Sequence, residues 1–144
     1  MIYTRLTIEA MKLAYYAHHG QTDKAGMPYI FHPYHLAEQM SDEYSTCVAL
    51  LHDVVEDTHI TLDDLKATFP KEVTDAVALL THHKSEPYWE YVKKLASNPI
   101  AKAVKLADIR HNSDCTRMPD AGEATLAYFA EKYRRAMQVL EEGE

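Results

Sequence analysis

Six consecutive residues, His52-Asp53-Val54-Val55-Glu56-Asp57, constrain this chain more than any other stretch. They carry one imidazole and three carboxyl groups, and they directly follow the apolar run Cys47-Val48-Ala49-Leu50-Leu51. Such a run belongs to a buried segment, and the C-terminal end of a helix disfavours negative charge. Buried charge is tolerated when it is paired or bound to a metal. The stretch therefore favours a divalent cation held by His52 and Asp53, with the two following acids beside it for proton chemistry.

Hydrophobic periodicity predicts one helix after another along the chain. Apolar residues recur at helical spacing from the first helix to the last, and Ser45 and Thr61 are candidate N-caps. No segment shows strand alternation with a hairpin signal. The fold class is therefore all-α: a single-domain helical bundle over residues 1–144, with about seven or eight helices. Their expected ranges are 5–18, 33–40, 45–55, 61–70, 71–81, 88–97, 100–112 and 126–140.

Composition excludes several classes of function. The net charge of −7 argues against nucleic-acid binding, which needs a basic face. No apolar run approaches the ~18 residues of a membrane span, and no apolar signal region begins the chain. The two cysteines, Cys47 and Cys115, form no CxxC pattern, so a cytoplasmic, reduced protein is expected. Whether it is a monomer or a homo-oligomer stays open, because the last amphipathic helix suits either a core or a second chain.

Four residues from three segments are candidate metal ligands: His32, His52, Asp53 and Asp108. Imidazole and carboxylate together suit Mn, Fe, Co or Zn, and a helical bundle can bring the segments together. Asn112 lies four residues after Asp108 and so shares its helix face. Taken singly, however, a histidine beside a proline is usually a surface residue, and an acid in a helix is usually solvated. The residues alone therefore leave metal binding open.

Three stretches carry a resemblance to a known family. They are Gly26-Met27-Pro28-Tyr29-Ile30-Phe31-His32-Pro33, Leu51-His52-Asp53-Val54-Val55-Glu56-Asp57, and Lys105-Leu106-Ala107-Asp108-Ile109-Arg110-His111-Asn112. In this order the chain resembles the HD-domain metal-dependent phosphohydrolases. Within them it is similar to the hydrolase domain of the RelA/SpoT alarmone enzymes and their small stand-alone relatives, over about residues 5–140.

The resemblance implies one divalent metal, most often manganese, held by the four candidate ligands. It implies that Glu56 and Asp57 orient or deprotonate the attacking water, although a solvated helix end is the alternative for them. It also implies that Asn112 contacts the nucleotide sugar and Lys24 a phosphate. The alternatives are a helix C-cap for Asn112 and a solvated loop position for Lys24.

The implied reaction is hydrolysis of guanosine 3′,5′-bis(diphosphate), ppGpp, to GDP and pyrophosphate. Two departures from the family pattern bear on it. Asp23 stands where the relatives carry an arginine beside the lysine, and it is expected to repel a polyphosphate; Ile109-Arg110 replaces the usual Arg-Leu, which leaves Arg110 without an assigned role. The substrate alternatives are therefore NADPH, with loss of its 2′-phosphate, or another nucleotide. A nucleotide-binding sensor without turnover is the non-enzymatic alternative.

Overall fold

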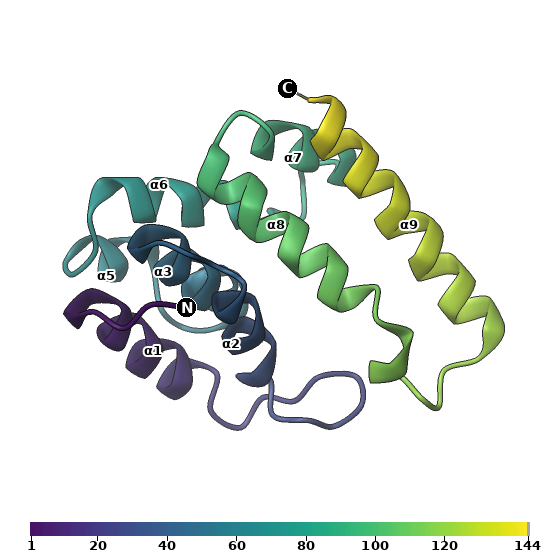
Figure 1. Ribbon diagram of the computed structural model, residues 1–144, viewed down its shortest axis with the longest axis horizontal. Helices are drawn as coiled ribbons and strands as arrows, with labels where there is room; N and C mark the ends of the chain where they lie inside the picture. The colour runs from purple at the N-terminus through teal and green to yellow at the C-terminus, as the bar shows by residue number, and fades with distance from the viewer. Residues whose placement is uncertain (144) are drawn as a thin grey trace.

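The computed structural model describes residues 1–143, and helices packed on one apolar core make up about two thirds of this part (Figure 1). The described residues contain no strand, only an isolated bridge between Thr22 and Pro28. The all-α prediction is confirmed. The elements are α1 (Arg5–Ala17), α2 (Phe31–Glu38), α3 (Glu43–Leu51), α4 (Val54–Asp57), α5 (Leu62–Lys66), α6 (Lys71–Leu80), α7 (Tyr88–Leu95), α8 (Pro99–Asn112), the 3₁₀ turn η1 (Cys115–Arg117) and α9 (Glu123–Glu142).

Side-chain caps fix where several helices begin. The predicted cap Thr61 is confirmed: its Oγ1 accepts from the Asp64 N–H at 3.1 Å, and Asp64 accepts from the Thr61 N–H at 2.9 Å. The predicted cap Ser45 is wrong. Asp42 caps α3 instead, because its carboxylate accepts from the Ser45 N–H at 2.8 Å and Ser45 lies inside the helix.

The helix predicted over 45–55 is broken at His52 and Asp53. The His52 Nδ1–H donates to the Ala49 carbonyl at 2.6 Å. In a continuous helix that carbonyl would accept a hydrogen bond from the backbone N–H of residue 53. Asp53 has φ −108° and ψ 0°, and α4 starts immediately after it. Asp53 therefore lies just before the N-terminus of α4, where negative charge is favoured, whereas Glu56 and Asp57 are the last two residues of this short helix.

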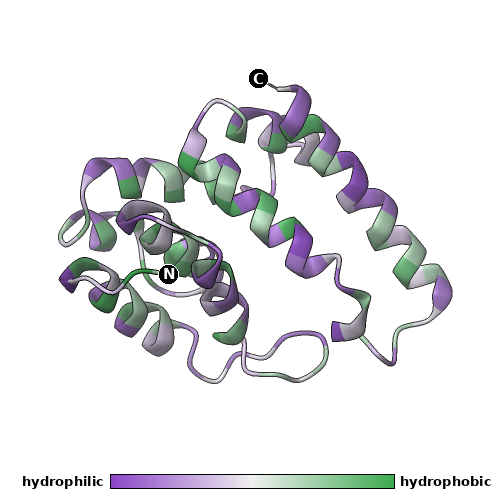
Figure 2. Cartoon of the chain, viewed as in Figure 1, coloured by the Kyte–Doolittle hydropathy of each residue, from purple (hydrophilic) through white to green (hydrophobic). Residues whose placement is uncertain are grey.

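Helix α3 is the centre of the core. All five residues from Cys47 to Leu51 are 0% exposed, and α3 contacts α1, α2, α6 and α8. Burying a leucine side chain such as Leu50 contributes about 1.5–3 kcal/mol. Helix α9 differs, with hydrophilic and hydrophobic residues both conspicuous along its length; its buried residues are Ala136 and Leu140, and it packs on α7 and α8 (Figure 2). The buried α3 gives its C-terminal residues a rigid support.

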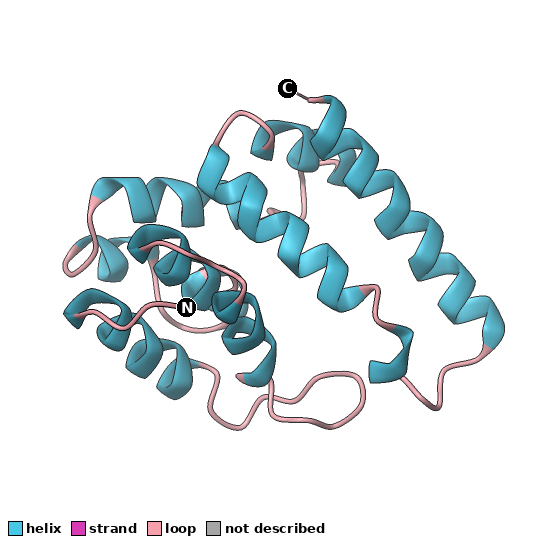
Figure 3. Ribbon diagram, viewed as in Figure 1, coloured by secondary structure: helices cyan, strands magenta, loops and turns pink. Residues whose placement is uncertain are grey.

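Two long connections lie at one end of the molecule (Figure 3). They are residues 18–30, between α1 and α2, and residues 113–122, which contain η1. Gly20 and Gly26 in the first have φ of 86° and 84°, a conformation that side chains with a Cβ disfavour. No helix within residues 1–143 combines the length and apolar character needed to cross a membrane.

Candidate metal centre and its pocket

The His52 side chain is held in one tautomer by the break between α3 and α4. Its Nδ1–H donates to the Ala49 carbonyl, so in the neutral imidazole the lone pair is on Nε2, where it can take up a proton or a metal cation. Nε2 is buried and has no hydrogen-bond partner within residues 1–143, although Asp53 Oδ2 lies 2.9 Å away. Two electron-rich atoms that face each other at this distance suit a cation shared between them.

Helices α2 and α8 bring the remaining candidate ligands to the same place. His32 Nε2 lies 2.8 Å from Asp108 Oδ1, which is 3.8 Å from His52 Nε2. One ligand atom each from His32, His52 and Asp53 lies within 4.8 Å of the others. The four predicted ligands therefore converge, and two imidazoles with two carboxylates form a donor set that fits a divalent transition metal.

The electrostatics of the cluster favour a bound cation. Burial alone would lower the pKa of His52, but the carboxylates of Asp53 and Asp108 raise it to about 9. Burial would likewise raise the pKa of Asp53, yet His52 holds it at about 2. The pKa of Asp108 is also well below its usual range, since Lys105 and His32 outweigh its burial. The carboxylates thus stay ionised and attract positive charge.

Residues of the 18–30 connection support the cluster from one side. The Tyr29 hydroxyl donates to Asp53 Oδ2. The Gln21 side-chain amide donates to the Asp57 carbonyl at 2.8 Å, and its oxygen lies 2.8 Å from His18 Nδ1. This connection therefore fixes both the candidate ligand Asp53 and the end of α4.

Glu56 and Asp57 lie on α4, one turn after the candidate ligands His52 and Asp53. Glu56 Oε1 accepts from the His82 N–H at 2.7 Å, which anchors it to the segment before α7. Burial raises the pKa of Glu56 and of Asp57, and the Asp53 carboxylate adds to both shifts. A carboxylate that holds a proton more readily than usual, beside a metal site, suits proton transfer.

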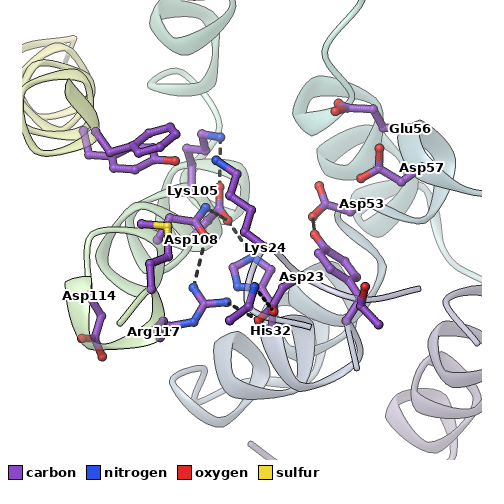
Figure 4. A pocket seen from close by; sticks show the side chains of 17 residues that line it. Asp23, Lys24, His32, Asp53, Glu56, Asp57, Lys105, Asp108, Asp114 and Arg117 are labelled. Atoms are coloured by element: carbon purple, nitrogen blue, oxygen red, sulfur yellow. Dashed lines mark hydrogen bonds and ion pairs between the residues drawn. The ribbon is translucent and has the colours of Figure 1, made fainter. Parts of the chain in front are cut away.

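The cluster opens into a cavity of about 410 Å³. Figure 4 shows Asp53, Glu56 and Asp57 on one side of it, and Lys24, Lys105 and Arg117 across from them. Its lining residues are Thr22, Asp23, Lys24, Ala25, Tyr29, His32, Asp53, Glu56, Asp57, Lys105, Asp108, Asn112, Asp114, Arg117, Met118, Phe129 and Tyr133.

Lys24 and Lys105 are cations on the cavity wall. Lys24 Nζ lies 3.8 Å from the centre of the Phe129 ring, and Lys105 Nζ donates to Asp108 Oδ2 at 3.0 Å. Burial alone would lower the pKa of Lys105, but Asp108 raises it, so the ammonium stays charged. Lys24 was predicted from the sequence as a phosphate contact, whereas Lys105 was not. The signal for Lys105 is its spacing: it precedes Asp108 by three residues and therefore shares its helix face.

Phe129 and Tyr133 form an aromatic wall of the cavity that was not predicted from the sequence. Phe129 and Tyr133 of α9 lie four residues apart with nearly parallel rings, 13° between planes. The helical spacing of apolar residues predicts only that one face of the last helix is covered, by the core or by a second chain. In the structure α9 packs on α7 and α8, and Phe129 and Tyr133 line the cavity.

Asn112 and Arg110 are the two residues of α8 whose roles the sequence left open. Asn112 is not the C-cap of α8, which is Ser113; its amide donates to Asp108 Oδ1 at 3.0 Å. Arg110 lines a different groove, with Asp42 and Pro99. The arginine that reaches the metal-site cavity is Arg117 of η1.

Three comparisons describe what this chain is similar to. Residues 10–118 match the family model described as HD domain. The bifunctional (p)ppGpp synthase/hydrolase SpoT of Escherichia coli is 36% identical over 119 residues, which are 72% of this chain and 17% of SpoT. The chain thus spans about one sixth of the length of that bacterial relative.

A shorter relative and a solved structure extend the comparison. The mouse guanosine-3′,5′-bis(diphosphate) 3′-pyrophosphohydrolase MESH1 is 36% identical over 118 residues, covering 73% of this chain and 66% of MESH1. A solved metazoan ortholog of SpoT that hydrolyses ppGpp superposes with a TM-score of 0.73 and 24% identity, covering 99% of this chain and 96% of that one. This superposition supports the helical fold.

Proposed function

This chain belongs to the HD domain family, and on that premise we propose that it is a metal-dependent phosphohydrolase that converts ppGpp and water to GDP and pyrophosphate. The similarity to SpoT and MESH1 supports the substrate. The cavity supports the reaction class, because it joins a cation site, two carboxyl groups with raised pKa values and several cationic side chains.

We propose His32, His52, Asp53 and Asp108 as the ligands of one divalent metal, with Mn²⁺ as the ion. The convergence of their donor atoms and the unpartnered His52 Nε2 support this assignment. A metal bound there would lower the pKa of a coordinated water and neutralise charge on the phosphoryl group. Fe, Co and Zn suit the same donor set, so metal content decides the ion.

Glu56 and Asp57 are the proposed catalytic acids. Both line the cavity beside the ligand Asp53, and Glu56 is held in place by the His82 amide. Their raised pKa values suit them to accept a proton from water and to return it to the 3′-oxygen of the leaving nucleoside. Hydrolysis of the bond between that oxygen and phosphorus yields a 3′-hydroxyl and pyrophosphate.

The opposite wall is the proposed nucleotide site. Lys24 and Lys105 provide positive charge for the phosphates, and the Phe129 and Tyr133 rings offer faces on which a base can stack. The Asn112 side chain is the proposed contact of the sugar. Its amide is shared with Asp108, so the nucleotide and the metal ligands would be held by the same turn of α8.

The single observation that carries this proposal is that three of the four proposed ligands, His32, Asp53 and Asp108, line the same cavity as Glu56 and Asp57. The test is pyrophosphate release from ppGpp by the purified protein with Mn²⁺, with phosphate release from NADPH measured alongside. Pyrophosphate release that Asp53→Ala abolishes is the expected result. Bound metal without release from ppGpp would contradict the substrate, and release from NADPH alone would replace it; turnover of neither would favour a sensor.

A further inference from the structure

His32 is contacted at both of its ring nitrogens by the same helix. Nε2 lies 2.8 Å from Asp108 Oδ1, and Nδ1 lies 2.8 Å from Nδ1 of His111. Asp108 and His111 are three residues apart on α8, so one helical turn holds both sides of the ring. The His32 and His111 ring planes differ by 7°, with centroids 5.0 Å apart.

The two nitrogens that face each other, His32 Nδ1 and His111 Nδ1, need one proton between them. If His32 gives the lone pair of Nε2 to a metal, its own proton is on Nδ1. That Nδ1–H is then the donor, and His111 Nδ1 is the acceptor, which leaves the His111 proton on Nε2. The direction of this hydrogen bond and the tautomer of the ligand are therefore coupled.

We propose that His111 is a positioning residue that accepts the Nδ1–H of His32 and so keeps Nε2 aimed at the metal. This inference rests on the proposed metal site. The other histidine ligand, His52, uses the Ala49 carbonyl for the same purpose. Of the two proposed histidine ligands, only His32 is oriented by a side chain. A substitution can therefore remove the hydrogen-bond acceptor of His32 but not that of His52.

Two contacts keep the His111 ring in place for this role. The His111 ring also stacks on His35, with ring centroids 4.1 Å apart and 24° between planes. Its backbone carbonyl accepts from the Arg117 guanidinium at 2.9 Å, which fixes the end of α8. The acceptor is therefore held by contacts that do not involve the metal site.

The test compares metal affinity in His111→Leu and His111→Asn, measured by titration calorimetry with Mn²⁺ and no nucleotide. Leucine removes the acceptor, whereas asparagine places an oxygen near the position of Nδ1. We expect His111→Leu to weaken Mn²⁺ binding about ten- to one-hundredfold and His111→Asn to recover most of it. The control is His59→Leu, an exposed histidine outside the cavity.

The outcomes separate this role from the proposed function. Wild-type affinity in a folded His111→Leu protein would overturn the inference and leave the metal site intact. Failure of the wild-type protein to bind Mn²⁺ would instead overturn the site itself. If His111→Leu does not fold, ¹⁵N shifts of the Zn²⁺-loaded wild-type protein give the same answer. They should show His32 protonated at Nδ1, and coordination through Nδ1 would overturn the inference.

Discussion

Asp23 and Arg117 form an ion pair in the wall of the cavity that contains the proposed metal ligands, with carboxylate Oδ2 3.6 Å from guanidinium Nη2. The other carboxylate oxygen of Asp23 accepts from the N–H groups of Ala25 and Met27, at 2.9 and 3.0 Å. Asp23 therefore builds its own loop, and its charge is partly answered by Arg117. The acid expected to repel a polyphosphate thus also has a structural role.

The ion pair predicts an effect on nucleotide affinity. Asp23→Asn keeps an oxygen for the loop amides but frees the Arg117 guanidinium for phosphate. We expect KM for ppGpp to fall roughly two- to fivefold with kcat unchanged, since partly exposed pairs contribute up to about 1 kcal/mol. Steady-state kinetics measure this, with the exposed Asp63→Asn as control. An unchanged KM would show that the loop does not face the nucleotide.

Removal of the ligand carboxylate predicts loss of the metal. Asp53→Ala deletes one of the four donors and leaves His52 Nε2 without its nearest polar neighbour. Calorimetry should show no Mn²⁺ binding, and pyrophosphate release should disappear. Asp63→Ala, on α5, serves as the matched control. Retention of wild-type Mn²⁺ affinity by Asp53→Ala would remove Asp53 from the ligand set.

Substitution of Glu56 by glutamine is expected to lower activity and to raise the stability of the metal-free protein at neutral pH. Glu56→Gln should bind Mn²⁺ normally but lose about 10²-fold or more in kcat, because an amide cannot accept the proton. Burial raises the pKa of Glu56, so between its ordinary and raised values the folded state binds more protons than the unfolded state. The free energy of unfolding therefore falls as pH rises through that interval.

At pH 7 the metal-free Glu56→Gln protein should consequently be the more stable of the two. Thermal unfolding in EDTA from pH 4 to pH 8 measures this, and the advantage of the variant should shrink toward the acid end. Full activity in Glu56→Gln would remove its proposed proton-transfer role. A Tm difference between variant and wild type that stays the same from pH 4 to pH 8 would contradict the destabilising effect assigned to the partly desolvated Glu56 carboxylate.

The aromatic wall predicts a binding defect without a defect in metal affinity. Phe129→Ala removes the ring beside Lys24 and should raise KM for ppGpp roughly tenfold, the effect of one lost base-stacking contact. Tyr128→Ala is the matched control, because Tyr128 is the adjacent residue, is 64% exposed and does not line the cavity. Equal KM values for both variants would place the base elsewhere.

The sequence predicts the helices well where periodicity is strong and fails where side chains override it. The expected helix over 45–55 is broken because the His52 ring takes a backbone carbonyl, an event that no hydrophobic pattern encodes. Ser45 and Asp42 are both residue types that cap helices well. Only the hydrogen bond from the Ser45 N–H to the Asp42 carboxylate shows that Asp42 is the cap.

The candidate site divides in the same way. The four candidate ligands could be named because their motifs resemble those of a known family, and the structure brings their side chains together. Phe129 and Arg117 are not recognisable, because an aromatic on an amphipathic helix and an arginine in a loop have many ordinary roles. Their place at the cavity depends on the packing of α9 and on the fold of η1.

The residues proposed to stack on the base and those proposed to bind the metal lie in different parts of the chain. The HD domain match ends at residue 118, after all four proposed ligands and both acids, whereas Phe129 and Tyr133 lie beyond it. The wall they form can therefore change through substitutions at cavity-facing positions of one helix, while the four proposed ligands stay unchanged. Such substitutions would alter the proposed nucleotide site without touching the residues proposed for metal binding and proton transfer.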